Sequence, residues 1–211
     1  MICKILVGVC IAAFLIWIYI RQRIYKRALI IVDMQNDFCD PQGALYVKGA
    51  EKVDISRLVK KYTLTAVSKD WHPENHYSFK ENGGQWPKHC VQKTWGAQLI
   101  ATIAKIAEKH VFPVFHKGDD PCDTNDYSDF SGHEAFCGGT LEALLKENGI
   151  AAVDVVGVAL DYCVKATALD AAKLGFKTRV LMKYAPAVDT SPEAIEKVIV
   201  ELEAAGVTIV Y

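Results

Sequence analysis

Three side chains of complementary chemistry lie close to the ends of apolar runs that we predict to be strands. Cys163 follows the run 151–158 and stands at the start of a predicted helix, where the helix dipole and free N–H groups favour a thiolate. Lys117 would add a cation, and Asp33 would accept a proton and return it. A nucleophile, a base and a cation together indicate covalent acyl transfer. Each residue alone has a plainer explanation, as a buried thiol, a solvated lysine or a turn-capping acid.

A second group of polar residues has the composition of a metal site. Asp70 and His72 are two residues apart, His76 follows four residues later, and His89 returns after a glycine-containing loop. Asp, His and His are ligands for Zn²⁺, Fe²⁺ or Mn²⁺, and a three-residue set leaves coordination positions open for water or substrate. The alternative is that these histidines only cap and pack a loop.

The elements that must position these residues alternate along the chain. We predict strands at 28–33, 63–70, 111–118, 151–158, 177–182 and 207–211, and helices at 51–62, 95–110, 139–149, 163–174 and 192–204. This alternation predicts an α/β fold with a six-stranded, mostly parallel sheet and helices on both faces. In such sheets the functional site lies beyond the carboxyl ends of the strands, where Asp33, Asp70, Lys117 and Cys163 all fall.

The N-terminal segment differs in composition from the rest. Residues 5–20 carry no charge and are followed by the basic stretch RQRIYKR. We therefore expect an N-terminal hydrophobic helix over 1–27, acting as a single-pass membrane anchor that leaves a domain over 28–211 in the cytoplasm. A cleaved signal peptide, an organelle-targeting segment and a core segment are the alternatives for these residues. The alternative localisation is a soluble protein, cytosolic or organellar after processing.

Charge and cysteine usage exclude some functions. The formal net charge is −1, from 24 basic and 25 acidic side chains, and without a basic stripe we expect no nucleic-acid partner. The seven cysteines form no CxxC pair, which indicates reduced thiols and a reducing compartment.

Five blocks in order resemble one family: IIVDMQNDFC, DWHPENHYSF, WPKHC, FHKGDD and GVALDYCVKATALDAAKLGF. They are similar to the nicotinamidase/pyrazinamidase branch of the isochorismatase-like cysteine hydrolases, from about Ala28 to the C-terminus. The resemblance implies a Rossmann-like three-layer sandwich. It also implies functional residues: the triad Asp33, Lys117 and Cys163, and the metal ligands Asp70, His72 and His89, with His76 as a further candidate.

The same resemblance implies details of substrate binding. It suggests a cis peptide bond between Val158 and Ala159, which would direct the Ala159 and Cys163 N–H groups at the substrate oxygen. Phe38, Trp86 and Tyr127 match aromatic pocket positions. The family as a rule has no N-terminal anchor, so residues 1–27 are a departure that bears on localisation and not on chemistry.

The expected reaction is metal-dependent hydrolysis of nicotinamide, and of pyrazinamide as a second substrate, to the acid and ammonia through a thioester in NAD salvage. We expect Zn²⁺ first, with Fe²⁺ or Mn²⁺ as alternatives, and a homo-oligomer is a further expectation. The rival enzyme is an amidohydrolase of ureido or carbamoyl compounds, since isochorismate hydrolysis needs neither metal nor thiol. A catalytically silent, membrane-tethered binding module and a structural zinc protein are the non-enzymatic alternatives.

Overall fold

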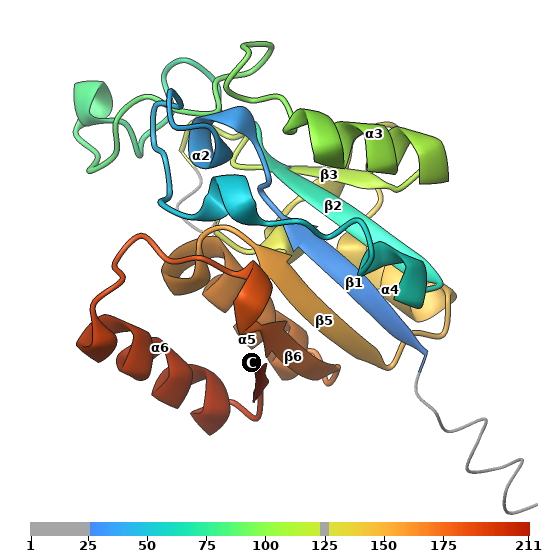
Figure 1. Cartoon of the computed structure of the whole chain (residues 1–211). Coiled ribbons are helices and arrows are strands. Elements are labelled where there is room, and N and C mark those ends of the chain that lie inside the picture. The colour runs from blue at the N-terminus through green and yellow to red at the C-terminus, as the bar shows by residue number, and fades with distance from the viewer. Residues whose placement is uncertain (1–25, 123–126) are drawn as a thin grey trace, which may run out of the picture.

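The computed structural model describes residues 26–122 and 127–211 of the chain (Figure 1). Within these residues one sheet holds seven strands in the order β4-β3-β2-β1-β5-β6-β7. The strands are β1 Arg27–Val32, β2 Leu64–Asp70, β3 Val114–Lys117, β4 His133–Glu134, β5 Ala152–Gly157, β6 Lys177–Leu181 and β7 Thr208–Val210. All neighbouring strands are parallel except β4, which pairs antiparallel with β3 at the sheet edge. The predicted α/β class with a mostly parallel sheet is confirmed.

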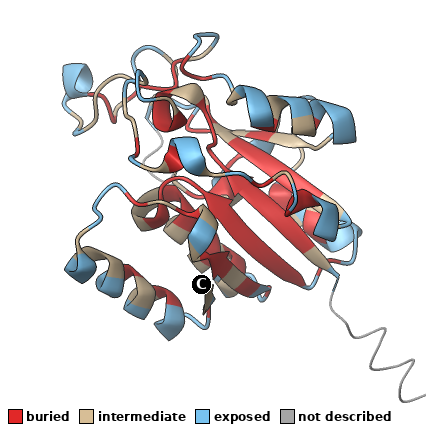
Figure 2. Cartoon of the chain, viewed as in Figure 1, coloured by how far each residue is buried: buried red, intermediate tan, exposed pale blue. Residues whose placement is uncertain are grey.

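Helices cover both faces of this sheet, as the alternation predicted. They are α2 Asn36–Cys39, α3 Ala101–His110, α4 Leu141–Glu147, α5 Lys165–Lys173 and α6 Pro192–Ala204. The buried sides of α4, α5 and α6 share one core cluster, and those of α2 and α3 share the other. Figure 2 shows the buried strands between helices whose outer sides are exposed.

The central strand β1 contributes side chains to the hydrophobic cores on both faces of the sheet. Successive side chains of a strand point to opposite faces. Ile30 and Val32 enter the cluster under α4, α5 and α6, whereas Leu29 and Ile31 enter the cluster under α2 and α3. A strand buried on both faces therefore has no polar alternation, as the sequence ALIIV shows.

The structure corrects several predicted elements. The stretch 51–62 forms no α-helix and contains only the short 3-10 turns Ala50–Lys52 and Val59–Lys61. Helix α3 begins at Ala101 and not at 95, because the preceding backbone pairs with the segment after β1: Gln98 and Gly96 carbonyls accept from Asn36 and Asp37. Strand β4, with two residues, is too short to give a hydrophobic pattern and was not predicted.

The structure contradicts the predicted membrane localisation. Across 26–122 and 127–211, no helix has the length and apolar character needed to cross a bilayer. The hydrophobic helix was predicted over residues 1–27, and residues 1–25 of this segment lie outside the part of the chain that the structure describes.

Candidate active site

Four neighbouring strands bring the predicted functional residues together at their carboxyl ends. Asp33 follows β1, Asp70 ends β2 and Lys117 ends β3, where it is in register with Asp70. Cys163 lies in a π-helical turn, Leu160–Val164, between β5 and α5. Because β3, β2, β1 and β5 are consecutive in the sheet, these four side chains share one site.

Lys117 is the centre of the cluster. Its Nζ lies 2.8 Å from Asp33 Oδ2 and 3.5 Å from Cys163 Sγ, and it also donates to Asp70 Oδ1. The ammonium therefore donates to Asp70 and Cys163 and faces Asp33 Oδ2 as an ion pair. The Lys117 side chain is fully buried, which removes competing water and strengthens each of these interactions.

Asp33 is held in place by its backbone and by Ser68. Its φ is +49°, a left-handed conformation that L-residues rarely adopt, and its carbonyl accepts from the Gln35 N–H at 2.7 Å. Ser68 Oγ on β2 accepts from the Asp33 N–H at 3.3 Å and donates to Asp33 Oδ1 at 3.0 Å. Apart from the Lys117 ion pair, Oδ2 has no hydrogen-bond donor among the described residues, so it can accept a proton from a nearby thiol.

The charges of the cluster follow from its burial. Burial and the Asp70 carboxylate raise the pKa of Asp33 from 3.8 to about 6, against the lowering effect of Lys117. Although burial opposes ionisation, Lys117 and His72 hold the pKa of Asp70 below its usual value. Likewise, burial disfavours the charged Lys117, but Asp33 and Asp70 raise its pKa well above 10.5.

The resting state of Cys163 differs from the sequence-based prediction of a thiolate. Burial raises the pKa of the Cys163 thiol well above 9.0, and the lowering effect of Lys117 does not compensate. The thiol is therefore neutral before reaction, because desolvation outweighs both the cation and the helix terminus. An adjacent base is required to make it a nucleophile, and Asp33 is placed for this, since its Oδ2 lies 2.8 Å from the same Lys117 Nζ that contacts Cys163 Sγ.

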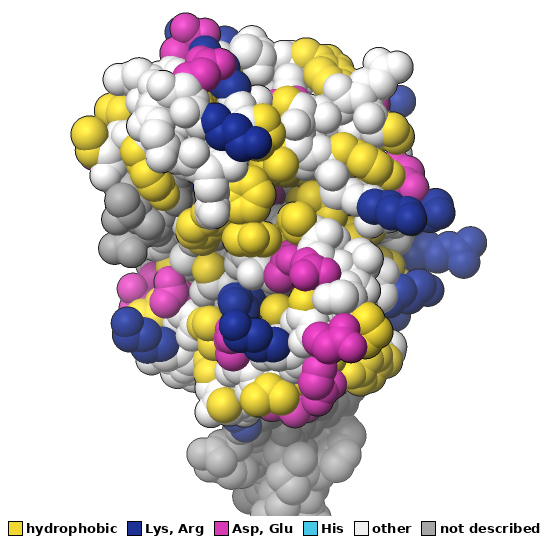
Figure 3. Space-filling model, turned by 90° about the vertical axis from the view of Figure 1, so that its left-hand side faces the viewer, with side chains coloured by type: hydrophobic (Ala, Val, Ile, Leu, Met, Phe, Trp, Pro, Cys, Tyr) yellow, Lys and Arg dark blue, Asp and Glu magenta, His cyan; other side chains and the backbone are white. Residues whose placement is uncertain are grey.

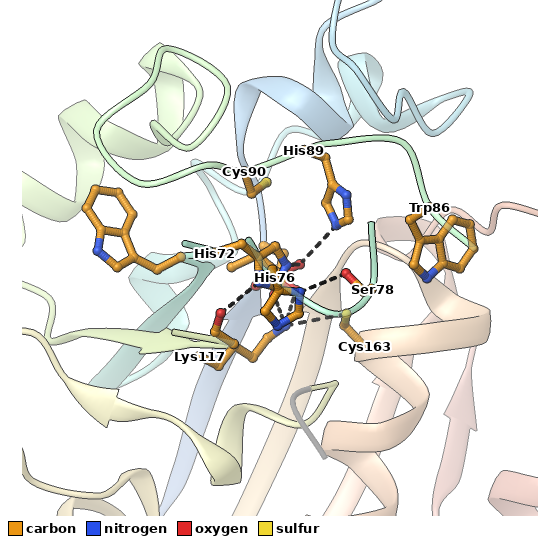
Figure 4. A network of polar contacts seen from close by, with 12 residues as sticks. His72, His76, Ser78, Trp86, His89, Cys90, Lys117 and Cys163 are labelled. Carbon is orange, nitrogen blue, oxygen red and sulfur yellow. Dashed lines mark hydrogen bonds and ion pairs between the residues drawn. The ribbon is translucent and has the colours of Figure 1, made fainter. Parts of the chain in front are cut away.

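The predicted metal ligands form a second cluster that shares Asp70 with the first. The ligand atoms of Asp70, His72 and His89 lie within 4.8 Å of one another, and all three residues are buried. Asp70 Oδ2 is 3.3 Å from His72 Nε2 and 3.9 Å from His89 Nε2. In Figure 4 the His89 ring points toward the group of side chains around His72 and His76.

The outer nitrogens of these two histidines are fixed by backbone carbonyls. His72 Nδ1 lies 2.8 Å from Gly118 O, and His89 Nδ1 lies 2.7 Å from Pro87 O. Such contacts place the ring proton on Nδ1 and leave Nε2 as the ligand atom, which is how proteins orient metal-binding histidines. Burial, followed by the nearby His72, lowers the pKa of His89 to about 4, so its ring is neutral. The residues present therefore fit a divalent metal ion.

His76 lies beside this cluster and not within it. Its ring stacks on His72 with centroids 4.0 Å apart, and its Nδ1 lies 2.8 Å from Ser78 Oγ. The set of ligand atoms that converge contains Asp70, His72 and His89 without His76. His76 is placed to support the orientation of the His72 ring.

A mostly apolar pocket opens above both clusters. Phe38, Trp86, Tyr127 and Ala159, all predicted from the resemblance, line it together with Cys163 and the metal-ligand candidates. The structure adds apolar walls from Leu45, Val47 and Val188. Figure 3 views the side of the molecule toward which the strands run, where apolar side chains gather across the middle with charged side chains above and below.

The pocket wall over Cys163 is closed by aromatic contacts. Trp86 Nε1 donates to Tyr127 Oη at 3.0 Å, and the Trp86 ring meets Tyr162 edge-on with centroids 5.0 Å apart. The peptide bond between Val158 and Ala159 is cis, as the resemblance implied. The Val158 N–H donates to Val32 O at 3.0 Å and the Leu160 N–H to Pro186 O at 2.9 Å, which hold the chain on both sides of this bond.

Sequence reasoning missed the polar residues that support the cluster. Gln35 donates to the Asp70 and Ala97 carbonyls and accepts from the Asp70 N–H, so it joins β1 to the end of β2. Ser68 could have been found, because a serine two residues before Asp70 in a buried strand shares the face of that aspartate. Asp129 had no local signal, since the 3-10 turn that it begins is fixed by a contact with a residue distant in sequence, Thr167 on α5.

Comparison with known proteins gives a consistent result. The isochorismatase domain family matches residues 27–210. The chain is 38% identical to a nicotinamidase of Saccharomyces cerevisiae, over 87% of this chain and 99% of the relative. It is 37% identical to a nicotinamidase of Escherichia coli, over 87% of this chain and 93% of the relative.

Solved structures are similar over the same range. The yeast nicotinamidase Pnc1p bound to the inhibitor nicotinaldehyde superposes with a TM-score of 0.80 at 35% identity, covering 87% of this chain and 99% of that chain. The pyrazinamidase of Pyrococcus horikoshii in complex with zinc gives a TM-score of 0.72 at 38% identity, covering 88% of this chain and 98% of that chain.

Proposed function

The chain belongs to the isochorismatase domain family, and from this we propose that it is a nicotinamidase, which hydrolyses nicotinamide to nicotinate and ammonia. One observation carries the proposal. A buried Asp33–Lys117–Cys163 cluster adjoins the Asp70–His72–His89 cluster at the base of an apolar pocket. We assign the hydrolase domain to residues 28–211.

The pocket suits a flat, neutral ring. Phe38, Trp86 and Tyr127 supply aromatic surface for the faces and edge of a pyridine, and Val47 and Val188 add apolar contact. The aldehyde bound to the yeast relative has the same ring, which supports this assignment. Pyrazinamide, with one more ring nitrogen, fits the same description as a second substrate.

Asp70, His72 and His89 would hold a divalent metal ion, which we propose to be Zn²⁺. Two imidazoles and a carboxylate match the ligand preference of zinc, and the Pyrococcus horikoshii relative is a zinc complex. A bound ion would supply a Lewis acid for the ring nitrogen of the substrate. His76 would keep the His72 ring in place through their stacking contact.

Asp33 and Cys163 carry out the acylation step. Asp33 Oδ2 takes the thiol proton, and the sulfur forms a bond to the amide carbon. The amide oxygen gains the negative charge and accepts hydrogen bonds from the Ala159 and Cys163 N–H groups, each worth on the order of 3 kcal/mol of barrier. The protonated Asp33 then gives its proton to the departing nitrogen, so ammonia leaves and a thioester remains.

The same carboxylate serves the hydrolysis step. Asp33 takes a proton from water as the water oxygen attacks the thioester carbon, and the C–S bond breaks to release nicotinic acid. Asp33 then returns its proton to the leaving sulfur, which restores the neutral thiol. Lys117 contacts both Asp33 and Cys163 Sγ, so it stabilises negative charge on either atom throughout the cycle.

Two alternatives are less well supported. The substrates of a ureido or carbamoyl amidohydrolase have no ring nitrogen for a metal to bind. A metal site formed by Asp70, His72 and His89 would then have no role in orienting the substrate. A catalytically silent binding protein would not need Asp33, Lys117 and Cys163 in contact, yet they are. The proposal concerns a small-molecule substrate only, and the homo-oligomer expected from the sequence stays a prediction.

The proposal is tested by product analysis. The purified chain is incubated with nicotinamide, and nicotinate and ammonia are measured before chelation, after chelation and after readdition of Zn²⁺. We expect equal amounts of both products, loss on chelation and recovery with the metal. Hydrolysis of a carbamoyl compound with no turnover of nicotinamide would refute the assignment.

A further inference from the structure

Asp37, in the short helix α2, is a buried acid that the mechanism above does not use. Each of its four polar atoms binds a backbone group. Its N–H donates to Gly96 O at 3.1 Å, and its carbonyl accepts from the Leu45 N–H at 3.1 Å. Its side chain accepts from two further N–H groups, that of Ala44 on Oδ1 at 3.0 Å and that of Cys90 on Oδ2 at 2.7 Å. One residue thus joins α2 to the chain around positions 44, 90 and 96.

The hydrogen bond to Cys90 bears on two of the metal-ligand candidates. Cys90 directly follows His89 (Figure 4), and its carbonyl accepts from the His72 N–H at 3.0 Å. The backbone of Cys90 is therefore held by Asp37 through its N–H and by His72 through its carbonyl. A shift of Cys90 would move His89 and would also break the pairing with His72.

The backbone of Cys90 is strained and needs this support. Its φ is +45°, in the left-handed region that L-residues seldom adopt. Such conformations persist where the surrounding contacts hold them, and a hydrogen bond to a carboxylate is a strong contact. The bond to Asp37 Oδ2 holds the chain in this turn directly after His89, whose Nε2 lies 3.9 Å from Asp70 Oδ2.

The neighbouring chain leaves room for the Asp37 carboxylate at Gly96. A Cβ added at this position would collide with Asp37 Oδ2 and with the carbon that carries it. An alanine here would therefore push the carboxylate away from the Cys90 N–H. Gly96 thus offers a way to displace Oδ2 without changing Asp37 itself.

The same acid fixes one wall of the pocket. Its side chain and carbonyl bind the N–H groups of Ala44 and Leu45, and Leu45 lines the pocket. The next residue, Phe38, also lines the pocket, and its carbonyl accepts from the Val47 N–H at 2.8 Å. The apolar wall and the metal-ligand candidates therefore share one buried support.

We propose that Asp37 is a positioning residue, which holds His89 and His72 in place for the metal ion and Leu45 in place for the substrate. It acts through the backbone of Cys90 and of Ala44. The part that concerns the substrate rests on the proposed nicotinamidase function, whereas the part that concerns the metal is measured without substrate.

Zinc affinity tests the role toward the metal. Zn²⁺ binding to the purified chain is measured by competition with a chromophoric chelator. Asp37→Ala removes the acceptor of the Cys90 N–H, so we expect its Kd for Zn²⁺ to rise by about 10- to 100-fold. Gly96→Ala displaces the same acceptor and should also raise this Kd. If Asp37→Ala does not fold, Gly96→Ala decides.

Asp154→Asn is the matched control for loss of a buried acid. Asp154 is fully buried in β5 and pairs with Arg27 and Arg179. It is in register with Leu29 in the middle of the sheet, away from the carboxyl ends of the strands. Its replacement should lower the free energy of unfolding while leaving the Kd for Zn²⁺ as in the parent.

Steady-state kinetics at saturating Zn²⁺ test the role toward the substrate. In Asp37→Ala we expect KM for nicotinamide to rise several-fold and kcat to stay within about threefold of the parent. The reason is that the four hydrogen bonds of Asp37 go to residues other than Asp33, Lys117 and Cys163.

The outcomes separate this proposal from the proposed function. A Kd for Zn²⁺ in Asp37→Ala within about twofold of the parent, or an equal rise in Asp154→Asn, would overturn the role toward the metal. A fall in kcat with KM unchanged would overturn the role toward the substrate. A parent that binds no Zn²⁺ would overturn the proposal even if it hydrolysed nicotinamide. A parent that binds Zn²⁺ but does not hydrolyse nicotinamide would refute the proposed function alone, and the Kd values would still decide the role toward the metal.

Discussion

At the scale of single residues, the central question is how the buried, neutral thiol of Cys163 could act as the nucleophile that we propose. The surroundings of Cys163 do not ionise it, because burial outweighs the Lys117 ammonium. They instead raise the pKa of Asp33 to about 6, which makes that carboxylate a stronger base than an exposed aspartate. The proton therefore moves from sulfur to oxygen only when a substrate carbon is present to take the electron pair.

The pH dependence of activity follows from the Asp33 carboxyl. Acylation requires it ionised, so we expect kcat/KM for nicotinamide to fall as the pH is lowered through about 6. Steady-state rates across this range, with metal content held constant, measure the midpoint. A rate that stays flat well below pH 6 would show that another group is the base.

Asp33 affects stability in the opposite direction to activity: its contribution to the free energy of unfolding is largest at low pH. Its folded-state pKa is raised from 3.8 to about 6, so the folded protein binds this proton more tightly than the unfolded chain. The contribution is fully present below pH 3.8 and is lost as the pH rises through about 6, a difference of about 3 kcal/mol. We therefore expect Asp33→Asn to be inactive at neutral pH but no less stable to urea than the parent. A large loss of stability would mean that the charge of Asp33 holds the site together.

Removal of the Lys117 charge should affect activity and stability together. In Lys117→Met, Asp33 and Asp70 lose their shared cation while staying buried, so we expect undetectable turnover and a loss of about 3–5 kcal/mol in the free energy of unfolding. Chemical denaturation and ammonia release measure the two effects. Lys173→Met, at the end of α5, is the control and should change neither.

At the scale of the elements, the close approach of β1 and β5 positions Cys163, the proposed nucleophile. Gly157 ends β5 with φ +114°, and an added Cβ would collide with the Val32 carbonyl oxygen. We expect Gly157→Ala to destabilise the fold by more than about 4 kcal/mol, since β1 and β5 are central strands.

Gly175 provides the matched comparison for Gly157. It also has a positive φ, of +88°, but an added Cβ would meet no atom within 4 Å. Gly175→Ala should therefore cost only about 1 kcal/mol, from the backbone conformation alone. Denaturation curves of the two variants test this, and equal losses would show that the clash between β5 and β1 is relieved at little cost.

The elements also show how far a single sequence can predict this fold. The strand β1 was identified because it contains the apolar run ALIIV, and β5 because its apolar run is interrupted only by Asp154. Helix α6 was identified because Ser191 caps it and Pro192 occupies its first turn. The stretch 51–62 was misjudged because its apolar spacing resembles a helix, although tertiary packing uses it as two 3-10 turns. Local patterns carry no information on the hydrogen bonds between residues 36–37 and 96–98, because of which α3 begins later than predicted.

The location of the candidate site was predictable from the sequence, but the protonation states in it were not. Asp33, Asp70, Lys117 and Cys163 could be grouped because they lie at or near the ends of strands that become neighbours. The protonation of Cys163 and the position of Asp129 were not predictable, because both depend on burial and on contacts between distant segments. The strand-end rule locates a site but does not determine the charges in it.

At the scale of the whole molecule, the metal-ligand candidates link binding to folding. A ligand that binds only the folded state stabilises it by an amount set by its concentration over Kd, about 2.7 kcal/mol at a hundredfold excess. Asp70 belongs to both clusters, so a bound ion would stabilise the catalytic residues as well.

We expect chelation to lower the Tm of the parent and to abolish turnover, and Zn²⁺ to restore both. His89→Ala should lose the metal and the metal-dependent rise in Tm, whereas His110→Ala, at the end of α3, should retain both. Elemental analysis and thermal unfolding with and without Zn²⁺ provide the measurements. Retention of a stoichiometric metal by His89→Ala would place the ion elsewhere.

The most direct test compares two buried cysteines. Cys163 and Cys39 are both free thiols with less than a tenth of their surface exposed, and Cys39 does not line the pocket. Nicotinamide turnover is measured for Cys163→Ala and for Cys39→Ala, each with its metal content determined. We predict a loss of at least about 10⁴-fold in kcat for Cys163→Ala with metal retained, and a rate near that of the parent for Cys39→Ala. Turnover by Cys163→Ala within tenfold of the parent would contradict a mechanism in which this sulfur forms the thioester.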